Sequence, residues 1–373
     1  MKRISVFTGT RAEYGLMKTL IKKLEKDIDI EFNLLISGSH LKSKYGNTIN
    51  EIKSDGIKNI SLFPIANESK YSNQTSFQTA ETIKLISQAL ETLNPNYLIV
   101  LGDRYESFAA ATAAHLSNIK VVHIHGGEVS LGSLDNKLRN AISQLSTIHF
   151  TSADIHKRNV QNIIGSSENV YNVGPLVVDG LLDFKKCSKN EFEKDTKFSF
   201  SKINFLVTFH PETLSSDFGI IGFKNLLNIL DNYDCNILFT APNADEGSDL
   251  IIEIINIYIQ KNRQKYFYIP SLGQKLFLNA LVLFDCIIGN SSSGLIEAPL
   301  LKKQVLNIGN RQKGRYRFGP VIDVTNDFNE ISKAVVSILN IDKIYKYESF
   351  NYLEEYKAKS PSTTIIKILK DSL

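Results

Sequence analysis

The feature that most constrains the fold is an alternation of short apolar runs with longer segments of helical periodicity. In the first half of the chain the runs that predict strands are Ile4–Thr8, Glu31–Ile36, Tyr97–Leu101, Lys120–His125, Ile148–Thr151 and Val170–Val173. Segments of helical periodicity lie between them, among them 16–26, 79–93, 104–116 and 155–164. Largely apolar strands that alternate with helices predict a buried parallel sheet covered by helices.

The alternation stops once and then starts again. After Gly174-Pro175 and a short helical segment, residues 187–202 (CSKNEFEKDTKFSFSK) show no apolar periodicity and are interpreted as a linker. The next strands are predicted at Asn204–Phe209, Asn236–Thr240, Tyr266–Ile269, Cys286–Gly289 and Val305–Ile308. We therefore predict two doubly wound α/β domains, 1–174 and 175–358, with a boundary near 174–202. A C-terminal helix at 359–373 is amphipathic and can pack back on the first domain.

Composition narrows the functional classes. The 373-residue chain is 43% hydrophobic and 22% charged, which is typical of a soluble globular protein. Its net charge of +4 gives no case for nucleic-acid binding. It has no apolar run near the roughly 20 residues that span a bilayer, and no apolar signal region. Three scattered cysteines are typical of reduced thiols, so we expect a cytoplasmic protein.

A phosphate site is predicted where the strand Cys286–Gly289 runs into Asn-Ser-Ser-Ser-Gly and an apolar-periodic segment that begins at Leu295. A strand, a turn of small residues and a helix start direct N–H groups and a helix dipole at an anion. Arg311 and Arg315 follow with positive charge, although an ordinary serine-rich turn is the alternative. Glu297 is unsuited to phosphate but suits ribose hydroxyls, so the pattern favours a nucleoside diphosphate.

Polar clusters follow most of the predicted strands: 8–11, 37–40, 102–104, 123–128, 210–212, 242–245 and 290–294. Ligands of doubly wound folds bind at the carboxyl ends of the strands. We therefore expect these clusters to face one interdomain cleft. The turn Gly9–Gly15 lacks G-x-G-x-x-G, and the second strand ends without an acid for a ribose 2′-hydroxyl, which argues against NAD.

Each candidate residue has an ordinary alternative. Arg11 is either a phosphate ligand or a solvated surface arginine, and Asp103 is a site residue, a helix N-cap, or both. The i, i+4 pair Asp135 and Arg139 is either part of the site or a helix-surface ion pair. His210 is either a capped loop residue or a phosphate donor.

His123 and His125 are predicted on one face of a strand. A metal site would need a third ligand, and no spacing in the sequence identifies Glu128 or Asp135 as that ligand. We therefore expect no metal. His123 is interpreted as a satisfied, half-buried histidine. His125 lies nearer the strand end and the two glycines, and is the better candidate for an acid or base.

Taken together, the motifs resemble the hydrolysing UDP-N-acetylglucosamine 2-epimerases of bacterial sialic-acid synthesis. The motifs that carry this resemblance are TGTRAEYG (8–15), SGSHLKSKYGNT (37–48), LGDRYES (101–107), HIHGGE (123–128), LDNKLRNAIS (134–143), FHPET (209–213), PNADEGSD (242–249), GNSSSGLIEAP (289–299) and NIGNRQKGR (307–315). The resemblance implies two Rossmann-like domains in the GT-B arrangement, a UDP-sugar substrate, and no metal or nicotinamide cofactor. We also expect a homo-oligomer, either a dimer or a tetramer.

The resemblance assigns two sets of residues. The implied UDP contacts are Arg11, Ala12, Gly15, Gly174, His210, Asn243, Ser291, Ser292, Glu297 and Arg311. The implied sugar-side residues are His40, Asp103, His125, Asp135 and Arg139. The chain has His125 where many relatives have Glu, and Asp135-Asn136 where relatives often have two acids. The assignment of base and acid among Asp103, His125 and Asp135 therefore stays open.

The implied reaction converts UDP-N-acetylglucosamine and water into N-acetylmannosamine and UDP, through elimination to 2-acetamidoglucal and then hydration. Three alternatives stay open: the same reaction on UDP-2,4-diacetamido-2,4,6-trideoxyglucose, a reversible epimerase that retains UDP, and a non-catalytic UDP-sugar-binding protein. A second, sugar-side set of acids argues against mere binding.

Overall fold

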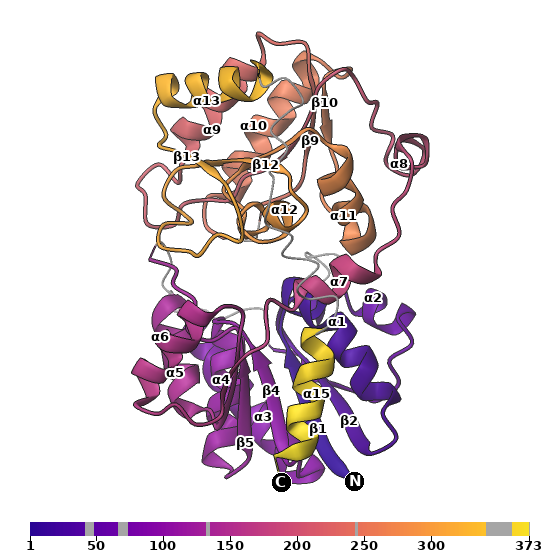
Figure 1. Cartoon of the computed structure of the whole chain (residues 1–373), viewed down its shortest axis with the longest axis vertical. Coiled ribbons are helices and arrows are strands. Elements are labelled where there is room, and N and C mark those ends of the chain that lie inside the picture. Colours follow the sequence, from indigo (N-terminus) through magenta and orange to yellow (C-terminus); the bar gives the residue numbers. More distant parts are fainter. Residues whose placement is uncertain (42–47, 66–73, 132–134, 243–244, 341–359, 373) are drawn as a thin grey trace. The chain divides into compact units, whose positions relative to one another are not determined.

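The computed structural model describes residues 1–41, 48–65, 74–131, 135–242, 245–340 and 360–372. The chain forms two compact units, labelled by element in Figure 1. Unit 1 comprises Met1–Glu128, Leu134–Gly180 and Tyr356–Leu373, and unit 2 comprises Val129–Ser133 and Leu181–Glu355. Both units are doubly wound, so the predicted α/β fold of two such domains is confirmed.

Unit 1 is built on a seven-stranded sheet in which all described pairs are parallel, in the order β3-β2-β1-β4-β5-β6-β7. The strands are β1 (Lys2–Thr8), β2 (Ile30–Ile36), β3 (Ile60–Leu62), β4 (Tyr97–Leu101), β5 (Lys120–Ile124), β6 (Ile148–Thr151) and β7 (Val170–Asn172). The strand order reverses between β1 and β4. That reversal opens the crevice in which doubly wound folds bind ligands.

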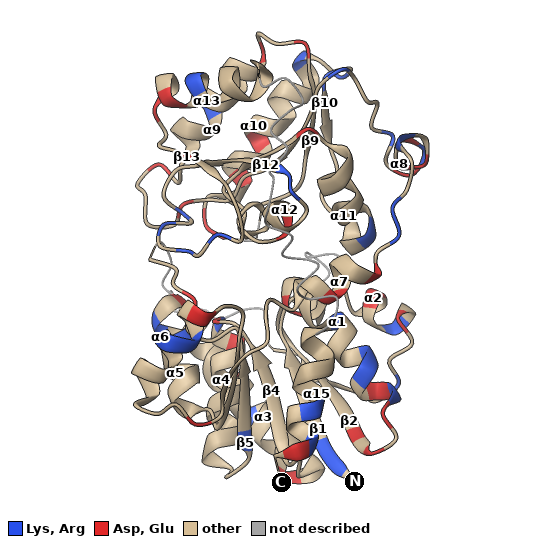
Figure 2. Ribbon diagram, viewed as in Figure 1, with Lys and Arg blue, Asp and Glu red and all other residues tan. Residues whose placement is uncertain are grey.

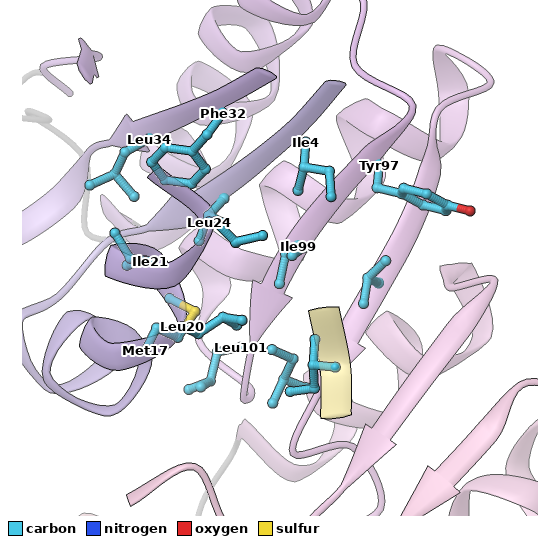
Figure 3. Close-up of a cluster of buried hydrophobic side chains, with 14 of the residues drawn as sticks. Ile4, Met17, Leu20, Ile21, Leu24, Phe32, Leu34, Tyr97, Ile99 and Leu101 are labelled. Carbon is cyan, nitrogen blue, oxygen red and sulfur yellow. The ribbon is translucent and has the colours of Figure 1, made fainter. Parts of the chain in front are cut away.

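The helices of unit 1 are α1 (Arg11–Lys26), α2 (Ile49–Ser54), α3 (Gln74–Leu93), α4 (Tyr105–Leu116), α5 (Asp135–Leu145) and α6 (Asp154–Ile164). Helix α7 (Val177–Asp183) begins in this unit, and α15 (Pro361–Asp371) belongs to it. Figure 3 shows the core between α1 and the sheet, in which Leu20 and Leu24 of α1 belong to one buried cluster with Ile4 of β1 and Ile99 of β4. These side chains are at most 1% exposed, so apolar burial holds α1 on the sheet.

Helix α15, near the C-terminus of the sequence, packs against the same core. Ile365 and Leu369 are fully buried in the cluster that includes α1 and β1. The carboxylate of Asp179 accepts hydrogen bonds from Ser360 Oγ at 2.5 Å and from Ser362 N at 2.9 Å. The first turn of α15 is therefore attached to α7 by hydrogen bonds and to α1 by apolar packing.

Unit 2 repeats the same winding with six strands in the order β10-β9-β8-β11-β12-β13, and its described pairs are also parallel. The strands are β8 (Asn204–Thr208), β9 (Asn236–Phe239), β10 (Tyr266–Tyr268), β11 (Cys286–Gly289), β12 (Gln304–Ile308) and β13 (Ile322–Val324). The helices are α8 (Lys189–Thr196), α9 (Ile220–Leu230), α10 (Ser248–Lys261), α11 (Gly273–Leu283), α12 (Glu297–Leu300) and α13 (Phe328–Asn340). Its reversal of strand order lies between β8 and β11.

The secondary structure differs from the sequence analysis in three places. The interpretation of residues 187–202 as a linker is wrong, because α8 lies within it. A capping box between Ser188 and Glu191 starts that helix, and Phe192 is buried against Phe198 and Phe284. The short edge strands β3 and β13 were not predicted, since three residues carry too little periodicity. The expected helix at Leu295 is a 3₁₀ turn, Ser292–Gly294, followed by the four residues of α12.

Charged residues lie mainly on helices and loops, while the strands are mostly uncharged (Figure 2). This distribution follows from burial, because both faces of each sheet are covered by helices. Within the described part of the chain, every helix is too short or too polar to cross a membrane.

Candidate functional site

Asn290 organises the strand ends of unit 2 at the point where the strand order reverses. Its side chain accepts a hydrogen bond from His210 N at 2.7 Å and donates one to His210 O at 2.8 Å, which joins the ends of β11 and β8. Its main-chain oxygen accepts from Arg311 Nη1 at 3.2 Å and from Gln312 Nε2 at 2.7 Å. Three loops that follow different strands therefore meet at one asparagine.

Strand β11 ends with a glycine that no other residue can replace without strain. Gly289 has φ +140°, and a Cβ atom built on it would lie 2.0 Å from Thr208 O. After Asn290, Ser291 caps the 3₁₀ turn and its hydroxyl oxygen accepts from Ser293 N at 3.4 Å. The predicted contribution of a helix dipole is corrected, because α12, which follows this turn, has four residues and so carries only a weak dipole. Hydroxyl and N–H groups remain as donors.

Arg311 supplies positive charge beside these donors. Its guanidinium lies 3.9 Å from the carboxylate of Asp245, and its side chain is 22% exposed. His210 is buried, and burial followed by the charge of Arg311 holds its pKa well below the usual value. His210 is therefore neutral near pH 7 and can offer one ring N–H donor, but no charge, to an anion.

Unit 2 accounts for most of the predicted UDP contacts. Ser291 and Ser292 lie on the turn that follows β11, and Glu297 is the first residue of α12. His210 follows β8, and Arg311 follows β12. Asn243 lies outside the described residues.

Sequence reasoning missed two residues that shape this strand-end cluster. Asn290 was treated only as part of a small-residue turn, although an amide at a strand end can act as both donor and acceptor. Glu212 is 6% exposed, and its carboxylate accepts from Asn310 N at 3.0 Å. Burial raises the pKa of Glu212. The signal for Glu212 in the sequence was its place directly after His210-Pro211.

In unit 1, Asp103 and Arg139 come together where β4 ends. The Arg139 guanidinium forms an ion pair with Asp103 and donates to Glu128 O at 2.6 Å. Arg139 is 1% exposed, whereas the Asp103 side chain is 20% exposed. The helix-surface alternative for Arg139 is therefore wrong, because the side chain crosses from α5 to the end of β4. The N-cap of α4 is Arg104, without a side-chain cap, so Asp103 does not cap that helix.

His125 lies outside β5, contrary to the prediction. The strand ends at Ile124, and His125 has φ +63°, a conformation that costs a non-glycine residue roughly 1–3 kcal/mol. Its Nδ1 lies 3.4 Å from Glu128 Oε1, and its Nε2 accepts from Leu176 N at 3.2 Å. His125 and Glu128 are both buried. Backbone strain at a polar strand end is a recognised mark of a functional site.

The two other predicted sugar-side residues, Asp135 and His40, differ in burial. Asp135 is the first residue of α5 and is half-buried. His40 is fully buried, with its ring nitrogens 3.0 Å from Thr8 Oγ1 and 2.7 Å from Thr48 Oγ1. Burial lowers the pKa of His40 to about 4. His40 is thus a neutral histidine that joins the ends of β1 and β2.

His123 matches its expected role as a satisfied histidine and is more deeply buried than expected. Its ring nitrogens lie 3.0 Å from Ser143 Oγ and 2.8 Å from Gly102 O. Burial lowers its pKa to about 3. His123 therefore stays neutral and holds the β4 end, with Asp103, against α5.

Four of the predicted UDP contacts belong to unit 1. Arg11, Ala12 and Gly15 lie in the first turns of α1, where Arg11 Nε is 3.5 Å from Glu51 Oε2. Gly174 has φ +85° in the turn between β7 and α7, and its N–H donates to Asn172 Oδ1 at 3.2 Å.

A buried acid shapes the turn between β1 and α1. The carboxylate of Glu13 accepts from Gly9 N at 2.7 Å, Thr10 N at 3.0 Å and Ser107 Oγ at 3.0 Å. Burial, together with the charge of Glu106, raises the pKa of Glu13 to about 7. Glu13 therefore changes charge near neutral pH directly beneath the turn that carries Arg11.

We predict that Glu13 makes stability depend on pH. Its folded pKa of about 7 exceeds the ordinary 4.5, so the stability from its proton is complete below pH 4.5 and is lost as pH rises through 7. The free energy of unfolding of the wild type, minus that of Glu13→Gln, should fall between pH 5 and pH 8 by on the order of 2 kcal/mol. Urea denaturation at both pH values measures this difference.

The buried histidines, including His40 and His123, oppose this trend, because their lowered pKa values make stability rise with pH up to their ordinary pKa. They cancel in the difference, since both proteins contain them. Glu91→Gln, on the exposed face of α3, is the matched control and should show no such change. A pH-independent difference for Glu13→Gln would contradict the prediction.

Among the residues that the structure describes, no three His, Cys, Asp or Glu side chains gather into a possible metal site. The polar groups instead form hydrogen-bonded clusters at the carboxyl edges of two parallel sheets. The fold and these clusters define a two-domain α/β protein of the kind that binds ligands at its strand ends.

A family profile described as UDP-N-acetylglucosamine 2-epimerase matches residues 22–370. The chain belongs to this UDP-sugar 2-epimerase family. It is 34% identical over 336 residues to the GDP/UDP-N,N'-diacetylbacillosamine 2-epimerase (hydrolyzing) of Campylobacter jejuni, covering 89% of this chain and 86% of that protein. It is also 34% identical over 377 residues to the polysialic acid biosynthesis protein P7 of Escherichia coli, covering 100% and 94%.

Solved structures agree with the fold. The crystal structure of UDP-GlcNAc 2-epimerase from Neisseria meningitidis bound to UDP-GlcNAc superposes with a TM-score of 0.81 at 21% identity, over 100% of both chains. At this identity the match shows the fold alone, and it extends over both units.

Proposed function

We propose that the protein is a hydrolysing UDP-sugar 2-epimerase that converts UDP-N-acetylglucosamine and water into N-acetylmannosamine and UDP. The observation that carries the proposal is the acid–base cluster at the β4 and β5 ends of unit 1, in which Arg139, Asp103, Glu128 and His125 are linked. A protein that only binds a UDP-sugar has no need of such a cluster. Family membership and the turn that follows β11 support the nucleotide part of the substrate.

Unit 2 is proposed to bind the diphosphate. The N–H and hydroxyl groups of Ser291 and Ser292, the guanidinium of Arg311 and one ring N–H of His210 are donors suited to phosphate oxygens. Glu297 is proposed to accept from the ribose hydroxyls. Of the unit 1 residues, Arg11, Ala12, Gly15 and Gly174 are proposed as further UDP contacts. Asn243 completes the proposed set.

Elimination is the proposed first step. The C1–O bond to UDP breaks, and the stabilised diphosphate takes the electron pair. As positive charge grows at C1, a base takes the C2 proton, and the C1=C2 double bond of 2-acetamidoglucal forms. We propose Asp103 as this base, because its carboxylate is partly exposed and is held by Arg139.

Hydration completes the proposed reaction. Water adds its oxygen to C1, and a proton returns to C2 on the opposite face. His125 and Asp135 are proposed to serve this second proton transfer, with Arg139 orienting Asp103. His40 is proposed to act indirectly, by holding the β1 and β2 ends.

The sugar itself is the finer part of the proposal. The Campylobacter jejuni relative is named for a diacetylbacillosamine substrate, which is a 2,4-diacetamido-2,4,6-trideoxy sugar. The same reaction on the corresponding UDP-sugar is therefore the second candidate. Both substrates share the C1–C2 chemistry, so the residues at the β4 and β5 ends do not distinguish them. Cytoplasmic location and assembly into a dimer or tetramer stay predictions.

One experiment tests this function. The purified protein is incubated separately with each of the two UDP-sugars, and the released sugar is identified by NMR. We expect free N-acetylmannosamine and UDP from UDP-N-acetylglucosamine. Release only from the diacetamido substrate would favour the second candidate. An epimerised sugar that stays attached to UDP would contradict hydrolysis.

The proposed diphosphate site predicts the effect of Arg311→Ala. Loss of one charged hydrogen bond should weaken UDP binding by about 1.5–3 kcal/mol. Isothermal titration calorimetry with UDP measures this loss. Arg263→Ala removes the same side chain from an exposed position in unit 2 and should leave the affinity unchanged. Unchanged UDP affinity in Arg311→Ala would contradict the site assignment.

A further inference from the structure

Glu128 contacts both halves of the acid–base cluster, although the resemblance assigns it no role. Its main-chain oxygen accepts from Arg139 Nη1 at 2.6 Å, and Arg139 pairs with Asp103. Its carboxylate oxygen Oε1 lies 3.4 Å from His125 Nδ1 and accepts from Ser152 Oγ at 2.8 Å. All of these groups belong to unit 1. Glu128 is thus in contact both with His125 and with the Arg139–Asp103 pair, which the proposed reaction needs.

The hydrogen bonds define the proton positions around Glu128. Leu176 N donates to His125 Nε2, so Nε2 is an acceptor and the ring proton of neutral His125 lies on Nδ1, which faces Glu128. Ser152 donates its hydroxyl proton to the same carboxylate oxygen and is 2.8 Å from His156 Nδ1. Since Ser152 uses its only proton on Glu128, His156 Nδ1 must be the donor of that bond. The Nδ1 proton of His125 and the hydroxyl proton of Ser152 therefore both face the Glu128 carboxylate, and the Nδ1 proton of His156 is donated to Ser152.

Burial strengthens this arrangement. Glu128 is 8% exposed, His125 6%, His156 3% and Ser152 0%. In a low-dielectric setting a carboxylate favours a proton on the imidazole beside it. Among the described residues, the other charged or titratable groups linked to the partners of His125 are His123 and His149, which face each other and Arg139, Asp103, which pairs with Arg139, and His156, which contacts Ser152.

We propose that Glu128 is a positioning residue of the reaction, whose carboxylate orients the His125 imidazole and holds its Nδ1 proton while its main chain holds Arg139 against Asp103. Ser152 donates to the same carboxylate oxygen that faces His125, and His156 contacts Ser152 in turn. The strained backbone of His125, with φ +63°, is kept in place by Glu128 and Leu176 acting on opposite ring nitrogens. This inference rests on the proposed function for its kinetic consequences, but not for its geometry.

Glu128→Gln tests the proposal, because the amide keeps one oxygen acceptor for Ser152 while the negative charge is removed. The main-chain bond to Arg139 is unaffected by this change. In ¹⁵N NMR spectra of the ligand-free protein we expect the wild-type His125 to be protonated at Nδ1. In Glu128→Gln the pKa of His125 should fall by about one, since the neighbouring negative charge is lost. An unchanged His125 pKa and tautomer would overturn the proposal.

Kinetics provide the second readout. With the UDP-sugar that the wild type hydrolyses, kcat of Glu128→Gln should fall roughly ten- to a hundredfold with KM within about twofold. The limb of the pH profile that follows His125 should move to lower pH. Glu168→Gln, an exposed glutamate of unit 1, is the matched control and should behave as the wild type in both measurements. Loss of thermal stability with an unshifted pH profile would point to a merely structural role and would overturn the proposal.

The experiments distinguish failure of the proposed function from failure of the positioning role of Glu128. If the wild type hydrolyses no UDP-sugar, the proposed function fails, while the NMR comparison still decides whether Glu128 controls His125. If the wild type is active and Glu128→Gln retains full kcat over the whole pH range, the positioning role fails and the proposed function stands.

Discussion

Asp103→Asn should lower turnover by about two orders of magnitude or more, with UDP affinity nearly unchanged. Asparagine has the same shape and still accepts a hydrogen bond from Arg139, but it cannot take a proton from C2. The proposed UDP contacts are other residues, so binding of the leaving group should be preserved. Steady-state kinetics and calorimetry with UDP measure the two quantities separately.

The control is Asp154→Asn, which makes the same change at an exposed position in the first turn of α6. Its turnover should match that of the wild type. The thermal stability of Asp103→Asn must also be recorded, because the buried Arg139 loses its charged partner. A folded Asp103→Asn enzyme with near-normal turnover would remove Asp103 from the proton transfer.

Gly289→Ala should destabilise unit 2 by about 4 kcal/mol or more, a loss seen only where a specific feature is broken. Two effects combine at this position. Alanine disfavours φ +140°, and its Cβ would lie 2.0 Å from Thr208 O and 2.7 Å from Thr208 C, in the neighbouring strand. The β11–β8 pairing must open to accept it, which also displaces Asn290 from His210. UDP binding should be lost with the fold of this edge.

Gly165→Ala separates the clash from the backbone strain. Gly165 ends α6 with φ +69°, and a Cβ there would meet no atom within 4 Å. Its substitution should cost only about 1 kcal/mol. The chain has no tryptophan, so urea denaturation is best followed by circular dichroism. Equal stability of the two variants would show that the close approach of β11 to β8 is not a constraint.

The regular part of the fold could be predicted because buried parallel strands are nearly continuous apolar runs. Tyr97–Leu101, Ile148–Thr151 and Cys286–Gly289 have the bounds that their apolar runs predict. The wrong predictions of secondary structure have local causes. Helix α8 has few apolar residues and depends on a capping box and one buried phenylalanine, so its periodicity is weak.

The candidate site could be predicted as a set of strand ends, because residues that follow parallel strands share one edge of the sheet. The partners of individual side chains could not be predicted, since they depend on contacts between residues that are far apart in the sequence. By its spacing Arg139 could be either a site residue or a helix-surface residue, and only the fold brings it to Asp103, 36 residues earlier. Glu128 and Asn290 lay inside recognised motifs, but the link of Glu128 to His125 depends on the turn between them, and the link of Asn290 to His210 depends on the pairing of β11 with β8.

The most direct test of the account is the reaction of UDP-N-acetylglucosamine in deuterated water, with the products followed by NMR. Elimination and rehydration require that the proton returned to C2 comes from solvent. We predict UDP and free N-acetylmannosamine that carries deuterium at C2. Hydrolysis that releases a sugar with its original hydrogen at C2, or no release of UDP, would contradict the proposed mechanism.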